Sequence, residues 1–151
     1  MLSGAQGDDD EAHGGHFAVA TGTVGPDGGW ADWTVNNFYT LDAVSEKGIV
    51  AARVPMDNYL MDLNSGQSWY RPVYVLTLVL KQDRAARRYQ EAIEPVYDRF
   101  YRHEFLYHHS AANCSGISMD ALRGIGWEIP RRGPTSLSLI HILTLPTIYS
   151  V

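Results

Sequence analysis

The chain has 151 residues, a length typical of a single domain, with 45% hydrophobic and 19% charged residues. This is ordinary globular composition, and it excludes a collagen-like or a largely disordered chain. The formal net charge of −5 at pH 7 argues against a nucleic-acid partner, because phosphate binding requires clustered lysines and arginines.

The N-terminal part predicts a disordered lead followed by a β-hairpin. Residues 1–13 are rich in Gly and Asp, and they lack the basic and apolar regions of a signal peptide. Residues 15–24 alternate as in a β-strand, with His16 near the start. Residues 25–29, Gly-Pro-Asp-Gly-Gly, are typical of a turn. The aromatic and β-branched residues 30–42 predict a second strand, which we expect to pair antiparallel with the first.

The middle of the chain predicts a central strand and a long helix. Residues 43–68 have weak periodicity, and we interpret them as mostly irregular with room for a helical turn. Residues 69–80 are apolar on both faces and predict a central strand that begins near Pro72; the run is too short to span a membrane. A helix should follow with Asp83 as its N-cap, and Pro95 should kink or divide it because proline lacks a backbone donor.

The segment around the only cysteine predicts a buried helix. Asn113 is a good N-cap, Gly126 is well placed to end the helix, and Cys114 falls in the first turn. An apolar stripe recurs at helical spacing: Ile117, Ala121, Leu122 and Ile125. The predicted fold class is therefore α+β, an antiparallel sheet packed with helices, with a buried helix that begins at the cysteine.

Cys114 has two interpretations. A free cysteine is often a small buried hydrophobe, and a lone cysteine excludes an intramolecular disulfide. A helix N-terminus also favours the thiolate, because it offers free N–H groups and the positive end of the helix dipole. A nucleophile further needs an imidazole and a polar group to orient it. His16 is the candidate base, and Asn36 or its neighbour Asn37 could orient the ring, although each is also typical of an ordinary strand residue.

The order of these elements resembles the circularly permuted papain-like (NlpC/P60-type) domains, in which a strand His, a polar residue on the next strand and a helix-opening Cys follow one another. The chain is more similar still to the Lnb-type periplasmic domain, named for a bacterial lipoprotein N-acyltransferase. The likeness runs from about Gly15 to Trp127. It depends on the motifs GHF, TVNNFY, KGI, YRPVYVLTLVL and NC.

This resemblance implies a permuted papain-like fold and cysteine-dependent acyl transfer or hydrolysis. Cys114 would be the nucleophile, His16 the general base and Asn36, or alternatively Asn37, the orienting residue. Backbone N–H groups near Ser115 would stabilise the oxyanion. The substrate would be an ester or amide, with lipids and lipoproteins among the candidates. Membrane association and a periplasmic or extracytoplasmic location for the parent protein enter only through the resemblance.

Two other interpretations stay open. In the first, the domain is a non-catalytic binding or structural module, in which Cys114 packs and aromatic stretches such as residues 30–33 contact a partner or lipid. In the second, histidines of residues 13–16 and 103–109 bind a metal, but neither stretch has a recognised ligand spacing. We expect no metal and no cofactor.

The last residues, 136–151, have the sequence SLSLIHILTLPTIYSV, which resembles the translation of sequencing-adapter read-through at the end of a truncated reading frame. We interpret them as a non-native tail rather than a real β-strand, and we exclude His141 from the chemistry. Residues 14–135 would then form the papain-like domain, as an internal or N-terminal piece of a longer protein.

Overall fold

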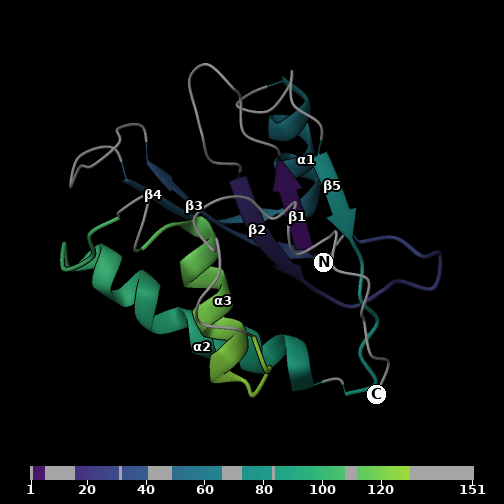
Figure 1. Cartoon of the computed structure of the whole chain (residues 1–151). Coiled ribbons are helices and arrows are strands. Elements are labelled where there is room, and N and C mark those ends of the chain that lie inside the picture. The colour runs from purple at the N-terminus through teal and green to yellow at the C-terminus, as the bar shows by residue number, and fades with distance from the viewer. Residues whose placement is uncertain are drawn as a thin grey trace.

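The computed structural model describes residues 2–5, 16–30, 32–40, 49–65, 73–82, 84–107 and 112–129. Within these residues the chain forms five strands and three helices (Figure 1). In chain order they are β1 (Leu2–Ala5), β2 (His16–Thr21), β3 (Thr34–Thr40), β4 (Ile49–Pro55), α1 (Met56–Ser65), β5 (Val73–Leu76), α2 (Arg84–Tyr101) and α3 (Cys114–Gly124). The predicted α+β class is confirmed.

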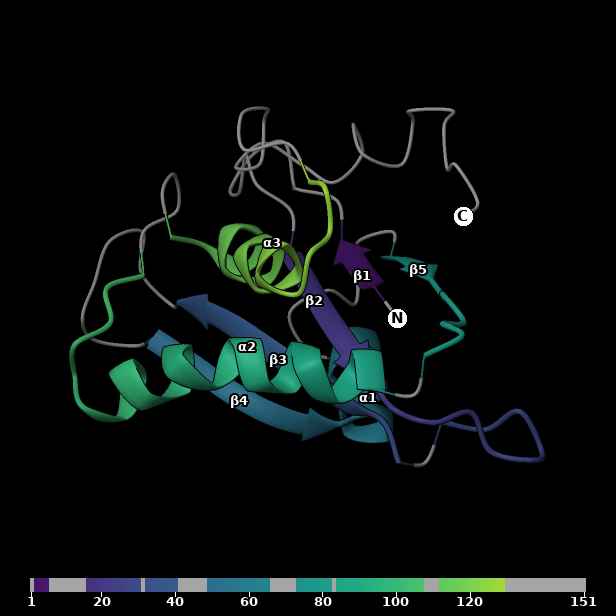
Figure 2. The ribbon, with the colours of Figure 1, turned by 90° about the horizontal axis from the view of Figure 1, so that it is seen from below.

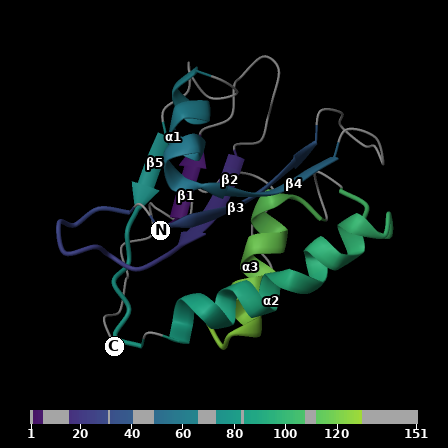
Figure 3. The ribbon, with the colours of Figure 1, turned by 180° about the vertical axis from the view of Figure 1, so that it is seen from behind.

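The strands form one antiparallel sheet with the order β4-β3-β2-β1-β5. Helices α2 and α3 lie side by side on one face (Figure 2), and α1 lies on the other (Figure 3). Alternation along β2 supplies both layers of the core, because successive side chains point to opposite faces. Phe17 and Val19 pack with α2 and α3, whereas Ala18 and Ala20 pack with α1.

The hairpin prediction is confirmed. Strands β2 and β3 pair antiparallel, with Val19 opposite Asn36. The turn between them is closed by a hydrogen bond from the Gly28 N–H to the Gly25 carbonyl at 2.9 Å. Gly28 has a φ of 78°, a backbone conformation that glycine adopts without steric cost.

The prediction of a disordered lead over residues 1–13 is wrong for Leu2–Ala5, which form β1 between β2 and β5. Four residues offer almost no periodic signal. The strand exists because both of its edges are hydrogen-bonded to neighbours, which compensates for its short length. Residues 6–13 lie outside the described residues, as do residues 130–151, so the predicted tail is not described.

The middle of the chain differs most from its prediction. Residues 43–68 were predicted to be mostly irregular, but they contain the seven-residue strand β4 and the ten-residue helix α1. Residues 69–80 were predicted to be a central strand, but β5 covers only four of them and lies at the sheet edge. Tyr74 and Val75 are half exposed there. An apolar stretch is therefore not sufficient to identify a central strand, since position in a sheet depends on partners distant in sequence.

Helix α2 runs without interruption through Pro95. Of the two predicted effects of this proline, a kink or a division of the helix, the division is therefore wrong. Asp83, its predicted N-cap, lies outside the described residues. None of the helices in the described ranges is long and apolar enough to cross a bilayer.

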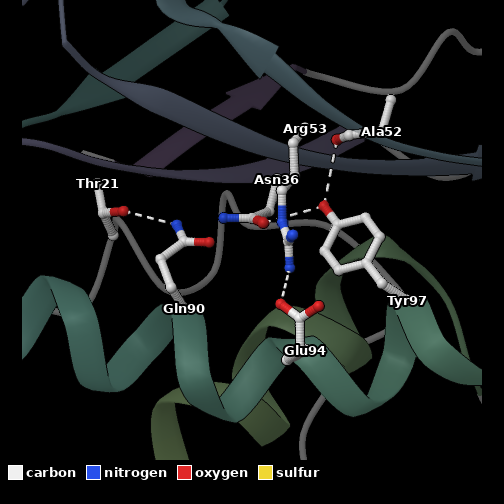
Figure 4. A network of polar contacts seen from close by, with 7 residues as sticks. All are labelled: Thr21, Asn36, Ala52, Arg53, Gln90, Glu94 and Tyr97. Atoms are coloured by element: carbon white, nitrogen blue, oxygen red, sulfur yellow. Dashed lines mark hydrogen bonds and ion pairs between the residues drawn. The ribbon is translucent and has the colours of Figure 1, made fainter.

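Polar contacts tie α2 to three successive strands (Figure 4). The three pairs are Gln90 with Thr21 of β2, Tyr97 with Asn36 of β3, and Glu94 with Arg53 of β4. The Tyr97 hydroxyl donates to the Asn36 Oδ1 at 2.9 Å, and the Arg53 guanidinium lies 4.2 Å from the centre of the Tyr97 ring. These contacts fix the height of α2 above the sheet.

Candidate active site

Helix α3 is capped at both ends, which fixes the position of its first residue. Asn113 has an extended backbone, and its Oδ1 accepts a hydrogen bond from the Gly116 N–H at 2.8 Å. At the other end Gly126 has a φ of 99°, and the Trp127 N–H donates to the Leu122 carbonyl at 3.1 Å. This is a Schellman motif. Both caps confirm the prediction from sequence, and Cys114 is the first helical residue.

The structure brings together Cys114 and His16, which are distant in sequence. His16 opens β2, and its imidazole is hydrogen-bonded to the Cys114 thiol. The cysteine is only 5% exposed and packs in the core layer formed with α2. The predicted buried helix start is therefore present, and the side chain of His16 is among the groups that contact its thiol.

The pKa of the Cys114 thiol is lowered below its ordinary value of 9.0. Burial, the largest single influence, raises this pKa, because it removes water from the thiolate. The hydrogen bond and positive charge of His16 lower it, and so do the backbone N–H of Phe17 and the hydroxyl of Tyr107. Donors that converge on the sulfur thus outweigh the cost of burial.

Tyr107 is a member of this cluster that the sequence reasoning missed. Its hydroxyl accepts a hydrogen bond from the Cys114 N–H at 3.1 Å and also contacts the thiol. Burial raises the pKa of Tyr107, and the negative charge of the neighbouring thiolate raises it further. The signal in the sequence was an aromatic residue seven positions before the cysteine, but spacing alone could not show that its hydroxyl turns back to the helix start.

The two asparagines of β3 point to opposite faces of the sheet. Asn36 is fully buried, and its Oδ1 is bound to Tyr97 on the face covered by α2. Asn37 is also buried, and strand alternation places it on the α1 side. The His16 ring, at the start of β2, meets the Tyr39 ring edge-on, with 6.4 Å between the ring centres.

The Oδ1 of the predicted orienting residue, Asn36, is therefore engaged by Tyr97. The Oδ1 of Asn37 is buried and has no hydrogen-bond partner among the described residues. A buried carbonyl oxygen of this kind usually has a donor nearby, because an unsatisfied acceptor is costly. Of the two amide oxygens, that of Asn37 is the one without an acceptor role among the described residues, and no hydrogen bond joins it to the imidazole.

The first turn of α3 offers one open donor. The N–H groups of Cys114 and Gly116 are bonded to Tyr107 and Asn113 respectively. The N–H of Ser115, the predicted oxyanion donor, makes no hydrogen bond to any described residue. Free N–H groups of a helix start are suited to binding a developing negative charge.

The stretches considered for metal binding are only partly described. His13, His108 and His109 lie outside the described residues, and His103 is exposed at the end of α2. Within the described part of the chain, no three acidic, His or Cys side chains are grouped as a metal site would require.

The described cluster of thiol, imidazole, hydroxyl and helix N–H groups has the components of nucleophilic acyl transfer. Comparison with known proteins adds no relative to this observation. No protein-family model, no curated protein and no solved structure matches the chain.

Proposed function

We propose that this protein is a cysteine-dependent acyltransferase or hydrolase, with Cys114 as nucleophile and His16 as general base. The observation that carries the proposal is the hydrogen bond between the thiol and the imidazole at the N-terminus of α3. A cysteine that only fills a core would have its pKa raised by burial, whereas the pKa of this thiol is lowered.

The reaction would begin when the Cys114 thiolate attacks the carbonyl carbon of an ester or amide. The Ser115 N–H would stabilise the resulting oxyanion. The tetrahedral intermediate then collapses, the bond to the leaving oxygen or nitrogen breaks, and the leaving group takes the proton held by His16. Water attacks the thioester in a hydrolase, and an amine or alcohol attacks it in a transferase. His16 accepts the proton of that second nucleophile.

Two further side chains would support this chemistry. Tyr107 would position the start of α3, because its hydroxyl accepts from the Cys114 N–H, and it would stabilise the thiolate as a donor. Asn37, rather than Asn36, would orient His16, since its Oδ1 has no partner among the described residues, whereas that of Asn36 accepts from Tyr97. Asn36 would instead hold α2 against the sheet through its hydrogen bond with Tyr97.

The resemblance to permuted papain-like domains of the Lnb type extends the proposal to the substrate. It favours an acyl group carried by a lipid or lipoprotein, and an extracytoplasmic location for the parent protein. These extensions depend on the resemblance of short motifs, which include those around His16, Asn36 and Cys114.

Thiol alkylation measured against pH tests the proposal. Native protein should react with iodoacetamide at Cys114, with an apparent pKa below 9.0, and should release p-nitrophenol from activated esters. Cys114→Ser should abolish ester cleavage. His16→Ala should lower it by about 10²–10⁴-fold, the usual contribution of a general base. His103→Ala is the matched control, because His103 is exposed at the end of α2.

Comparison of the asparagines gives a second test. Asn37→Ala should slow alkylation near neutral pH, whereas Asn36→Ala should lower the stability of the fold and leave the pH profile of the thiol unchanged. Labelling of Cys114 only after denaturation would contradict the proposal. So would a His16→Ala variant that behaves like His103→Ala.

The second candidate, a non-catalytic module on the same scaffold, is favoured by the low exposure of Cys114, which is 5%. A module of that kind needs no accessible thiolate. In such a module, the alkylation rate of Cys114 would not change when His16 is replaced by Ala.

A further inference from the structure

A second feature of the molecule lies at the other end of α3. A pocket of about 640 Å³ is bordered by Leu122 and Ile125, about two and three helical turns after Cys114, and by Trp127, which follows the end of α3. At 1.5 Å of rise per residue, Leu122 lies about 12 Å along the helix from Cys114. The pocket is therefore separate from the thiol and imidazole.

The walls of this pocket are mostly apolar, with polar groups from Thr21, Thr23 and Gln82. They come from the end of β2 and the loop after it, from residues 78–82, from the first turns of α2 and from the end of α3. Two tryptophans, Trp33 and Trp127, line it, and none of its described lining residues carries a charge. The Trp33 indole N–H is already bonded to the Thr23 carbonyl at 2.9 Å, so this ring presents mainly apolar surface.

The mouth of the pocket carries exposed apolar side chains. Val79 is 81% exposed, and Val24 and Leu80 are each about half exposed. All three also line the pocket. Large apolar side chains that are exposed singly are common, but several of them gathered around a concavity mark a binding site.

We propose that this pocket binds an uncharged, apolar small molecule. A charged ligand would lose its hydration without gaining an ionic partner from the described walls. The volume lies within the ~300–1,000 Å³ typical of ligand pockets. The concave shape favours a small molecule over a protein partner, which would need a complementary surface of about 800 Å².

Binding of 1-N-phenylnaphthylamine, an uncharged probe that fluoresces in apolar surroundings, tests this proposal on the whole chain. We expect saturable binding of one probe per chain, with quenching of tryptophan emission because Trp33 and Trp127 line the pocket. Ala86→Phe should weaken binding by about tenfold or more, since a ring placed on the α2 wall occupies the site. Arg88→Phe is its control: the same residue is introduced two positions later, outside the pocket.

A variant at the protein surface is a second test, which stays informative if the Ala86→Phe substitution prevents folding. Val79→Asp places a charge at the exposed mouth and should weaken the probe severalfold, whereas Met61→Asp, on an exposed position of α1, should not. Equal binding by Val79→Asp and Met61→Asp would overturn the proposal, as would the absence of binding to the unmodified chain. Cys114→Ser should bind the probe normally, so failure of the acyl-transfer proposal would be recognised separately.

Discussion

The contact between Tyr107 and the start of α3 makes a quantitative prediction. Tyr107→Phe removes only the hydroxyl that accepts the Cys114 N–H at 3.1 Å. Both residues are buried, so water cannot readily replace the lost acceptor. An unsatisfied buried donor costs about 1–3 kcal/mol, and we expect the free energy of unfolding to fall by that amount.

The same substitution should change the chemistry of the thiol. The Tyr107 hydroxyl is one of the groups that lower the pKa of Cys114, so its removal should raise that pKa and slow alkylation near neutral pH. Urea unfolding followed by far-UV circular dichroism measures the stability, and iodoacetamide labelling against pH measures the thiol. The matched control is Tyr101→Phe, which removes a hydroxyl from an exposed ring at the end of α2.

One pattern of results would refute this reasoning. If Tyr107→Phe unfolds at the same urea concentration as Tyr101→Phe and its labelling profile is unchanged, the hydroxyl neither holds the helix start nor contacts the thiolate. A loss of stability alone would assign Tyr107 a purely structural role. A loss of stability together with a raised thiol pKa is expected only if the Tyr107 hydroxyl contacts both the N–H and the sulfur of Cys114.

Three more predictions concern the frame of the site. Asn113→Ala removes the acceptor for the Gly116 N–H and should destabilise the protein by about 1 kcal/mol in urea unfolding. Gly22→Ala should cost about 1–3 kcal/mol, because the new Cβ would lie 2.3 Å from the Trp33 ring, whereas Gly124→Ala meets only ordinary contact and should be neutral or stabilising. Above pH 10 stability should fall by at most about 4 kcal/mol per pH unit, because burial raises the pKa of three tyrosines that the unfolded chain ionises near 10.0. These are Tyr89, Tyr97 and Tyr107. Denaturant titration at pH 8 to 12 measures this slope, and a flat profile above pH 10 would contradict it.

The features of the fold that sequence predicted well are those encoded locally. The caps of α3 need only a side-chain acceptor before the helix and a residue tolerant of positive φ after it, and Asn113 and Gly126 supply them. The hairpin of β2 and β3 is likewise specified by its turn residues. Strands β1 and β4 were missed, because their stability comes from pairing with neighbours rather than from a pattern of their own.

The candidate site could be predicted only in part for the same reason. Cys114 and His16 were identified from residue type and from their places at a helix start and a strand start. The choice between Asn36 and Asn37 could not be made from sequence, because a shift of one residue in register exchanges the faces of a strand. Tyr107 required knowledge of how the segment before α3 folds back, which is a property of tertiary structure.

The surroundings of Cys114 bear directly on whether it is a packed thiol or a nucleophile. Burial by itself would hold the thiol neutral, and a neutral thiol needs no donors. Here an imidazole, a backbone N–H of Phe17 and a phenol are directed at the sulfur, and together they lower its pKa. His16 contributes most to this lowering, so His16→Ala should raise the pKa of the Cys114 thiol. Iodoacetamide labelling of this variant against pH measures that shift without a substrate, and an unchanged profile would contradict a nucleophile activated by the imidazole.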